Sequence, residues 1–284
     1  MQYDNLINKL LDLGIEEDIH TGDITTESII PESMNAVATM TAKEDGVISG
    51  LEIVKRVYDR FQDNVIFTPY FKDGDSVTKG DVILKIEATY PTLLKGERLS
   101  LNIFQRMCGI ATETARYVKE LAATSTELLD TRKTAPGLRV LDKLAVKHGG
   151  GTNHRMGLYD MAMIKDNHIK MAGGIAKAVE QVRSKIDSSI KIEVETTNLD
   201  EVNQAIQAGA DIIMLDNMGT DAMKEAVSII KAAGKGIKTE ASGNMSIPRL
   251  KEVASTGVDY ISVGALTHTV KGMDISMNIQ VENK

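Results

Sequence analysis

The second half of the chain alternates short apolar, strand-like segments with helical ones, and this alternation limits the possible folds more than any other feature. Six strand-like segments lie between residues 127 and 266, with the sequences ELLDT, MAMIKDN, IKIEVET, IIMLDN, IKTEAS and YISVGAL. Strands that are each followed by a helix form parallel sheets, because the helix provides the crossover to the next strand. We therefore expect parallel strands, either closed into a barrel or open as a doubly wound sheet.

A weak internal repeat favours the barrel. AIQAGADIIMLDNM and EVASTGVDYISVGAL both run from the end of a helix through Gly and Asp into a strand, and both leave the strand at a polar residue or glycine. Such echoes occur in any α/β protein, but repeated strand-helix units are typical of barrels. The expected fold class of this part is an α/β barrel.

The first portion of the chain has a pattern typical of a small α+β domain. The strand-like runs AVATMTA, GVISG, VIFTPY and VILKIEA are separated by turn sequences and interrupted by a helix over about 51–61. Leucines between residues 6 and 13 predict an amphipathic helix that Gly14 ends, before a polar loop. A longer helical pattern over about 92–123 is expected to link the two domains.

Composition excludes several classes of protein. Of the residues, 42% are hydrophobic and 26% are charged with both signs interspersed, which indicates a globular core and neither a disordered tail nor a general nucleic-acid surface. Cys108 is the single cysteine, so no intramolecular disulfide and no cysteine-rich zinc site can form, and a reducing cytoplasm is expected. No secretory signal and no apolar run of membrane-spanning length is expected.

Cations gather in one stretch of this acidic chain, whose formal net charge is -7. Arg132, Lys133, Arg155 and Lys165 lie between residues 129 and 168, next to glycines and predicted strand ends. In a barrel the carboxyl ends of the strands form the site. Arginine meets a carboxylate or phosphate with two hydrogen bonds and lysine supplies a point charge, although each one alone could be a surface charge. Together they predict a pocket for a small polyanion.

Most of the predicted strand exits are polar, ionisable or glycine. The residues at these exits are Asp130, Arg132, Lys133, Lys165, Asp166, Asn167, His168, Glu195, Asp216, Glu240, Ser242 and Gly264. Glu195 and Asp216 are 21 residues apart, which is one strand-helix unit, so we expect them on neighbouring strands. They could hold Mg²⁺, which prefers oxygen ligands, or they could pair with the nearby lysines.

Two glycine loops and two histidines complete the candidate site. Ser242-Gly243-Asn244 and Val263-Gly264-Ala265 follow the last two predicted strands, where this architecture usually binds phosphate. The spacing of His154 and His168 does not fit a zinc site, so we expect an orienting role for His154 beside Arg155.

At these residues the sequence resembles the quinolinate phosphoribosyltransferase family over nearly the whole chain. The matching segments, in family order, are Glu17-Asp18, Gly22-Asp23, Thr25, GERLSLN, DTRKTAPGLR, GGGTNHR, MIKDNH, IEVE, MLDN, EASGN and ISVGALTH. The resemblance implies an N-terminal α/β sandwich domain over 1–111, joined by the tail 274–284, and a TIM-like barrel of six parallel strands over 112–273.

The resemblance also implies a role for each candidate residue. Arg132, Arg155 and Lys165, with Thr131 and His154, would hold the two carboxylates of quinolinate. Lys133 would contact 5-phosphoribosyl 1-pyrophosphate, Glu195 and Asp216 would face its ribose and Mg²⁺, and Ser242, Gly243 and Gly264 would bind its 5′-phosphate. Arg98 would reach the barrel mouth of a second subunit, so a homodimer with shared active sites, or a hexamer built from it, is implied.

The implied activity is transfer of phosphoribosyl to quinolinate with loss of CO₂, in the cytoplasm, without nucleic-acid or membrane partners. Three alternatives remain open from the sequence: a relative acting on nicotinate or another ring, a Schiff-base aldolase using Lys165, and a non-catalytic phosphate-binding protein. His20, His148 and Asn244 have no assigned role.

Overall fold

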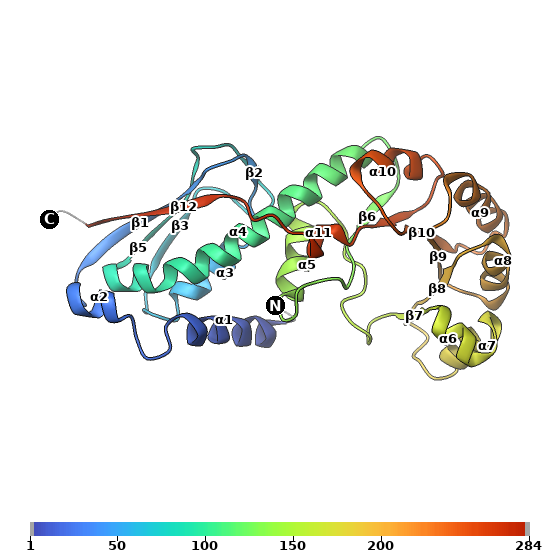
Figure 1. Cartoon of the computed structure of the whole chain (residues 1–284), viewed down its shortest axis with the longest axis horizontal. Helices are drawn as coiled ribbons and strands as arrows, with labels where there is room; N and C mark the ends of the chain where they lie inside the picture. Colours follow the sequence, from blue (N-terminus) through green and yellow to red (C-terminus); the bar gives the residue numbers. More distant parts are fainter. Residues whose placement is uncertain (1–2, 282–284) are drawn as a thin grey trace. The chain divides into compact units, whose positions relative to one another are not determined.

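The computed structural model describes residues 3–281, which form two compact units of a mixed α/β fold (Figure 1). Unit 1 comprises Met1–Ala115, Thr134–Gly150 and Leu266–Lys284, and unit 2 comprises Arg116–Lys133 and Gly151–Ala265. Residues 1–2 and 282–284, at the ends of the expected N-terminal domain and its tail, lie outside the described residues. The domain boundaries expected from the sequence stay a prediction.

Unit 1 contains a four-stranded antiparallel sheet in the order β12-β1-β5-β3. Its strands are β1 (Asn35–Ala42), β3 (Ile66–Pro69), β5 (Val82–Thr89) and β12 (Ile275–Val281). Alternate residues of β1 are buried, so one face of the sheet packs on a core that includes Tyr58, Leu93 and Phe104. A separate two-stranded antiparallel ribbon pairs β2 (Gly46–Val47) with β4 (Ser76–Val77).

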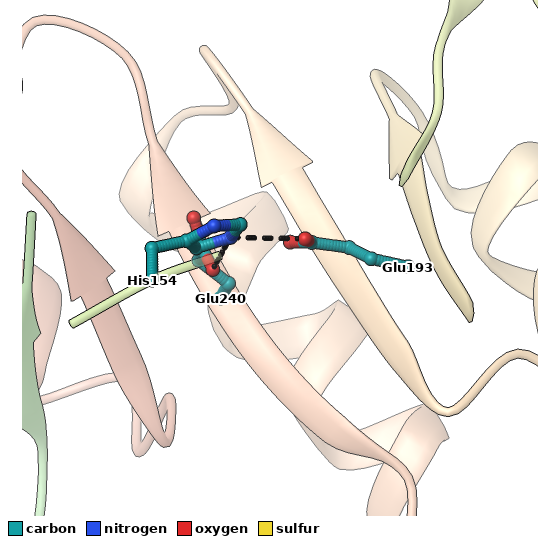
Figure 2. Close-up of side chains that lie close together, drawn as sticks. All are labelled: His154, Glu193 and Glu240. Carbon is teal, nitrogen blue, oxygen red and sulfur yellow. Dashed lines mark hydrogen bonds and ion pairs between the residues drawn. The ribbon is translucent and has the colours of Figure 1, made fainter. Parts of the chain in front are cut away.

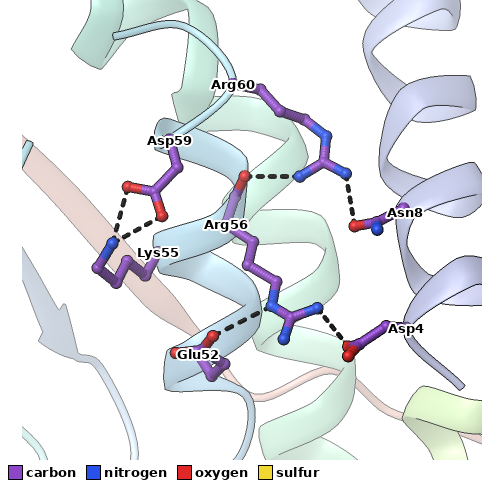
Figure 3. A network of polar contacts seen from close by, with 7 residues as sticks. All are labelled: Asp4, Asn8, Glu52, Lys55, Arg56, Asp59 and Arg60. Atoms are coloured by element: carbon purple, nitrogen blue, oxygen red, sulfur yellow. Dashed lines mark hydrogen bonds and ion pairs between the residues drawn. The ribbon is translucent and has the colours of Figure 1, made fainter. Parts of the chain in front are cut away.

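The helices of this part of the chain are α1 (Asp4–Asp18), α2 (Ile24–Ile29), α3 (Leu51–Tyr58), α4 (Tyr90–Leu121), α5 (Arg139–His148) and α11 (Ala265–His268). Two arginines, Arg56 on α3 and Arg60 just after it, contact side chains of α1 (Figure 3). Arg56 Nη1 lies 2.7 Å from Asp4 Oδ1, and Arg60 donates to Asn8 Oδ1 at 2.9 Å. These partly exposed contacts orient α1, but the Arg56–Asp4 ion pair contributes only about 1 kcal/mol or less.

Unit 2 is a six-stranded parallel sheet in the order β6-β11-β10-β9-β8-β7. The strands are β6 (Glu127–Leu129), β7 (Ala162–Ile164), β8 (Ile192–Thr196), β9 (Ile212–Asp216), β10 (Lys238–Ser242) and β11 (Tyr260–Ser262). The first strand pairs with the last and the others follow chain order, which is the order of a barrel and not of a doubly wound sheet. The expected six-stranded barrel-like fold is confirmed.

The barrel is opened between β6 and β7, which no ladder joins in the described residues. A single parallel bridge from Leu129 to Thr152 places the segment before His154 along the free edge of β6. The connecting helices are α6 (Asp166–Ala172), α7 (Ile175–Arg183), α8 (Leu199–Ala208), α9 (Thr220–Ala232) and α10 (Ile247–Ala254), and those after β8 to β10 lie outside the strands in Figure 1.

The prediction that Gly14 ends the first helix was wrong. The helix α1 continues to Asp18, and a Cβ on Gly14 would lie 2.6 Å from Cδ1 of Leu99 in α4, so the glycine permits close helix packing. The expected polar loop is correspondingly shorter, because α2 begins at Ile24 with the Asp23 side chain as its N-cap. The helix α6 and the strands β4 and β12 were not predicted from the sequence.

A buried ion pair supports unit 1. Arg106 Nε and Nη2 donate to the two carboxylate oxygens of Asp142 at 2.8 and 2.9 Å, and Arg106 Nη2 also reaches the carbonyl of Thr267 at 3.3 Å. The Asp142 side chain is 0% exposed and that of Arg106 25%. Burial raises the pKa of Asp142 even though Arg106 opposes that shift.

We expect Asp142→Ala to lower the free energy of unfolding by about 3 kcal/mol, because it leaves the Arg106 guanidinium partly buried without its carboxylate. Urea titration measures the change. The matched control is Asp59→Ala, which removes an exposed pair with Lys55 and should cost less than about 0.5 kcal/mol. Equal losses in the two variants would contradict this assignment.

Candidate active site at the carboxyl ends of the strands

The predicted site residues of unit 2 follow the carboxyl ends of the parallel strands, which meet at one edge of the sheet. Thr131, Arg132 and Lys133 come just after β6, and Lys165 directly after β7. Glu195 is the penultimate residue of β8, while Asp216 and Ser242 are the last residues of β9 and β10. Gly264 follows β11. The structure therefore brings together all of the predicted site residues except Arg98, which lies exposed on α4 in unit 1.

Arg155 is half-buried close to a second guanidinium. Burial and then the charge of Arg132 lower the pKa of Arg155. Arg155 Nη1 donates to the carbonyl of Met161 at 3.2 Å and Nη2 to Sδ of Met163 at 3.5 Å. Its Nε is buried and has no hydrogen-bond acceptor among the described residues. Two adjacent cations with a buried, unused donor suit an anionic ligand.

The acidic residues lie on neighbouring strands, as expected. Glu195 Oε2 is 3.3 Å from Lys165 Nζ. Glu195 therefore pairs with a nearby lysine, which was one of the two alternatives expected from the sequence. Asp216 Oδ2 accepts a 2.9 Å hydrogen bond from the side-chain amide of Asn217. The Glu195 side chain is 17% exposed, and Asp216 is half-buried, so both carboxylates remain partly accessible.

His154 has protein partners at both ring nitrogens, and Figure 2 shows the two glutamates that meet Nε2. The backbone N–H of Arg155 donates to His154 Nδ1 at 2.8 Å, so Nε2 carries the proton. That Nε2 lies 3.0 Å from Oε2 of Glu193 and 3.2 Å from Oε2 of Glu240. Burial and the charge of Glu240 raise the pKa of Glu193 to about 7. The ring thus orients the neighbouring backbone, and its contact with quinolinate stays a prediction.

Glu193 was not predicted as a site residue, and the prediction that Glu240 lies at a strand exit was wrong. Both are 0% exposed, and Glu240 is not a strand exit, because β10 continues for two residues beyond it. Side chains alternate along a strand, so Glu193 faces the same side as Glu195. A period of two within IEVE was the pattern that could have revealed it.

The loop after β10 has a close contact that requires glycine. Gly243 has φ +98, and a Cβ there would lie 2.2 Å from Oδ1 of Asn217. Asn217 also donates its backbone N–H to the carbonyl of Ser242 at 3.0 Å, which joins the ends of β9 and β10. The helix α10 begins only at Ile247, three residues beyond Asn244.

His168 and His148 have structural contacts in the described residues. His168 Nδ1 accepts the backbone N–H of Lys165 at 3.0 Å at the start of α6. His148 Nδ1 lies 2.8 Å from Oγ of Ser49 in unit 1. Thr131 Oγ1 accepts the backbone N–H of Lys133 at 3.0 Å, which shapes the turn after β6.

No helix among residues 3–281 combines the length and the apolar character that crossing a membrane requires.

Comparisons with known proteins agree over the whole chain. The family model "Quinolinate phosphoribosyl transferase, N-terminal domain" matches residues 23–108, and the model of the C-terminal domain matches 110–278. A "Probable nicotinate-nucleotide pyrophosphorylase [carboxylating]" of Bacillus subtilis is 44% identical over 98% of this chain and 95% of its own length. A mitochondrial "Quinolinate phosphoribosyltransferase [decarboxylating] 2" of Nicotiana glauca is 40% identical over 97% of this chain and 83% of its own.

Solved structures give the same result. The crystal structure of NadC from Streptococcus pyogenes superposes with a TM-score of 0.92 at 38% identity, covering 98% of this chain and 97% of that one. Fold, sequence and the arrangement of charged residues thus point to one family. This chain belongs to the quinolinate phosphoribosyltransferase family.

Proposed function

We propose that this chain transfers the phosphoribosyl group of 5-phosphoribosyl 1-pyrophosphate to quinolinate, giving nicotinate mononucleotide, CO₂ and pyrophosphate in NAD biosynthesis. The observation that carries the proposal is the arrangement of Arg155, close to Arg132, with Lys165 and Glu195 at the same edge of the sheet. Two carboxylates on one ring would match these cations, and family membership supports this choice.

In this proposal Arg132, Arg155 and Lys165 bind the carboxylates of quinolinate, with Thr131 and His154 shaping the pocket. Lys133 contacts the pyrophosphate donor, and Ser242, Gly243 and Gly264 bind its 5′-phosphate through the loops after the last two strands. Arg98 comes from a second subunit, so the working unit is a homodimer or a hexamer built from dimers. A cytoplasmic location is proposed from the single cysteine.

The donor set at the strand ends fits Mg²⁺. Glu195 and Asp216 offer carboxylate oxygens that are partly accessible, and hard oxygen donors are the ligands that this ion prefers. These two residues would hold it, directly or through water. When bound, Mg²⁺ neutralises charge on the pyrophosphate group.

The residues of this chain then act by position and charge. The quinolinate nitrogen forms a bond to the ribose C1 as the bond from C1 to the pyrophosphate oxygen breaks, and the carboxylates of Glu195 and Asp216 stabilise the positive charge that develops on C1. The nitrogen becomes cationic. The adjacent carboxylate leaves as CO₂, its bonding electron pair stays on the ring carbon beside that nitrogen, and this carbon takes a proton from solvent. No dedicated acid or base is required.

Release of labelled CO₂ from carboxyl-labelled quinolinate tests the proposal. We expect label to be released only with 5-phosphoribosyl 1-pyrophosphate and Mg²⁺ present, one CO₂ for each pyrophosphate, and slower turnover of nicotinate. Faster turnover of nicotinate, a borohydride-trapped adduct on Lys165, or donor binding without pyrophosphate release would each replace this proposal with one of its rivals.

A further inference from the structure

Three buried ionisable side chains form a cluster inside the barrel of unit 2. Glu193 of β8, Glu240 of β10 and His154 place one oxygen or nitrogen each within 4.8 Å of one another (Figure 2). Glu193 and Glu240 are 0% exposed, and the His154 side chain is 7% exposed. None of the roles proposed above uses the two glutamates.

We propose that this cluster of His154, Glu193 and Glu240 is a positioning device for the pocket that binds the carboxylates of quinolinate. The inference rests on the function proposed above. The glutamates hold the His154 ring, the ring holds the backbone of Arg155, and the Arg155 guanidinium is thereby directed at the ligand. Glu193 and Glu240 act through His154 and touch no substrate, because they are fully buried.

The ring of His154 is linked directly to the backbone of Arg155. Nδ1 of His154 accepts the Arg155 N–H at 2.8 Å, which requires the ring in one orientation and one tautomer. Nε2 meets carboxylate oxygens on two different strands, at 3.0 and 3.2 Å, and these contacts favour a proton on Nε2. A histidine held at both nitrogens cannot turn, so the N–H of Arg155 has a fixed acceptor.

Asp130 also anchors the segment that precedes Arg155. Its Oδ1 accepts the backbone N–H of His154 at 2.9 Å, and its Oδ2 accepts the side-chain amide of Asn153 at 2.6 Å. Asp130 is itself 0% exposed and directly follows β6. The free edge of β6 and the interior of the barrel therefore both hold the backbone that carries Arg155.

The members of the cluster are close in sequence to other proposed substrate contacts. Side chains two residues apart on a strand face the same side, so Glu193 lies one layer below Glu195 and Glu240 one layer below Ser242. His154 directly precedes Arg155 in the chain. Each member of the cluster thus lies next to a residue to which we assign a ligand contact.

The energetic argument also favours a positioning role. Glu193 Oε1 and Glu240 Oε1 are buried without a hydrogen-bond partner among the described residues, while Glu240 Oε2 meets His154 Nε2 at 3.2 Å. Such groups destabilise a fold relative to apolar side chains of similar volume, so a core built for stability alone would not contain them. Leucine in place of Glu240 should therefore preserve or raise stability while it releases the His154 ring.

The test compares Glu240→Leu, Glu240→Gln and Thr239→Val by steady-state kinetics and thermal unfolding. We expect Glu240→Leu to raise the KM for quinolinate about tenfold or more, to leave the KM for 5-phosphoribosyl 1-pyrophosphate within about twofold, and to keep the unfolding temperature at or above that of the wild type. Glu240→Gln should restore most of the affinity, because its amide oxygen accepts from Nε2. Should Glu240→Leu not fold, Glu193→Leu makes the same test from β8.

Thr239→Val is the matched control. Thr239 is buried on the same strand, faces the opposite side and hydrogen-bonds to Asp259, so its loss should lower stability without changing the KM for quinolinate. Three results would overturn the proposal: an unchanged KM for quinolinate in the leucine variant, an equal rise in both KM values, or stoichiometric Zn²⁺ or Mn²⁺ in the purified protein that is lost in Glu240→Leu. If the wild type releases no CO₂ from quinolinate, the proposed function fails instead.

Discussion

Replacement of Arg155 by alanine is expected to lower kcat/KM for quinolinate by about a thousandfold, equivalent to about 4 kcal/mol. The guanidinium is half-buried, its Nε has no acceptor among the described residues, and Arg132 adds like charge beside it. A carboxylate bound there would make charge-assisted hydrogen bonds in a partly desolvated pocket, and loss of one partner leaves the other charge uncompensated. Steady-state kinetics with varied quinolinate measure the effect.

Arg155→Lys should recover only part of the loss, because lysine lacks the planar fork that meets a carboxylate with two hydrogen bonds. Arg183→Ala is the matched control: its guanidinium forms a 2.7 Å ion pair with Asp211, before β9, away from the strand ends that carry the site. We expect its kinetics to stay within about twofold of wild type. A wild-type kcat/KM for quinolinate in Arg155→Ala would show that Arg155 does not bind this substrate.

Asp216→Asn is expected to lower kcat by about a hundredfold to a thousandfold while the KM for quinolinate changes little. The change keeps the shape of the side chain and removes the charge that we assign to stabilising the ribose carbon. Asp216 separates an effect on kcat from an effect on quinolinate binding better than Glu195 does. Loss of the Glu195 carboxylate would also free Lys165, a proposed quinolinate ligand, from its 3.3 Å contact. Single-turnover measurements report the chemical step directly.

The same strand supplies the control. Asp211 lies just before β9 and Asp216 is its last residue, so Asp211→Asn makes the same chemical change at the opposite end. Asp211 accepts the backbone N–H of Ile192 at 2.7 Å, and its replacement should lower stability without a comparable loss of kcat. An equal loss of kcat in both variants would show that Asp216→Asn acts through the stability of the fold, and would contradict the role of Asp216 in stabilising the ribose carbon.

The barrel strands could be predicted because buried parallel strands are short apolar runs with clear boundaries. β9 shows this plainly, since Ile212–Asp216 follows Gly209 and ends at a polar residue. β12, with the sequence ISMNIQV, alternates apolar and polar residues and could have been predicted as a strand, but its pairing with β1, more than two hundred residues earlier in the chain, could not. Local periodicity carries no information on such a pairing.

Gly14 shows a different limit of sequence interpretation. Glycine ends many helices, but it also occurs inside a helix where another chain segment comes close. Only the position of Leu99 on α4 distinguishes these cases, and that position is a property of the folded unit.

The candidate site was predictable where charge and strand ends coincide, as at Arg132, Lys165 and Asp216. The cluster below it was not, because Glu193 lies within a strand and its partners come from distant segments. Asp130 and Asn153 are 23 residues apart, and their 2.6 Å contact depends on the path of the chain along the edge of β6. Sequence patterns identify the strand ends, whereas the structure shows which side chains orient the residues there.

Equilibrium binding of three pyridine acids tests the central claim most directly, namely that the cations at the strand ends select a ring with two adjacent carboxylates. Calorimetric titration would compare quinolinate with nicotinate and with pyridine-2-carboxylate, in the wild type and in Arg155→Ala. We expect quinolinate to bind the wild type about a hundredfold more tightly than either monocarboxylate, and this ratio to fall below about tenfold in the variant. Equal affinities of the wild type for all three acids would contradict the account.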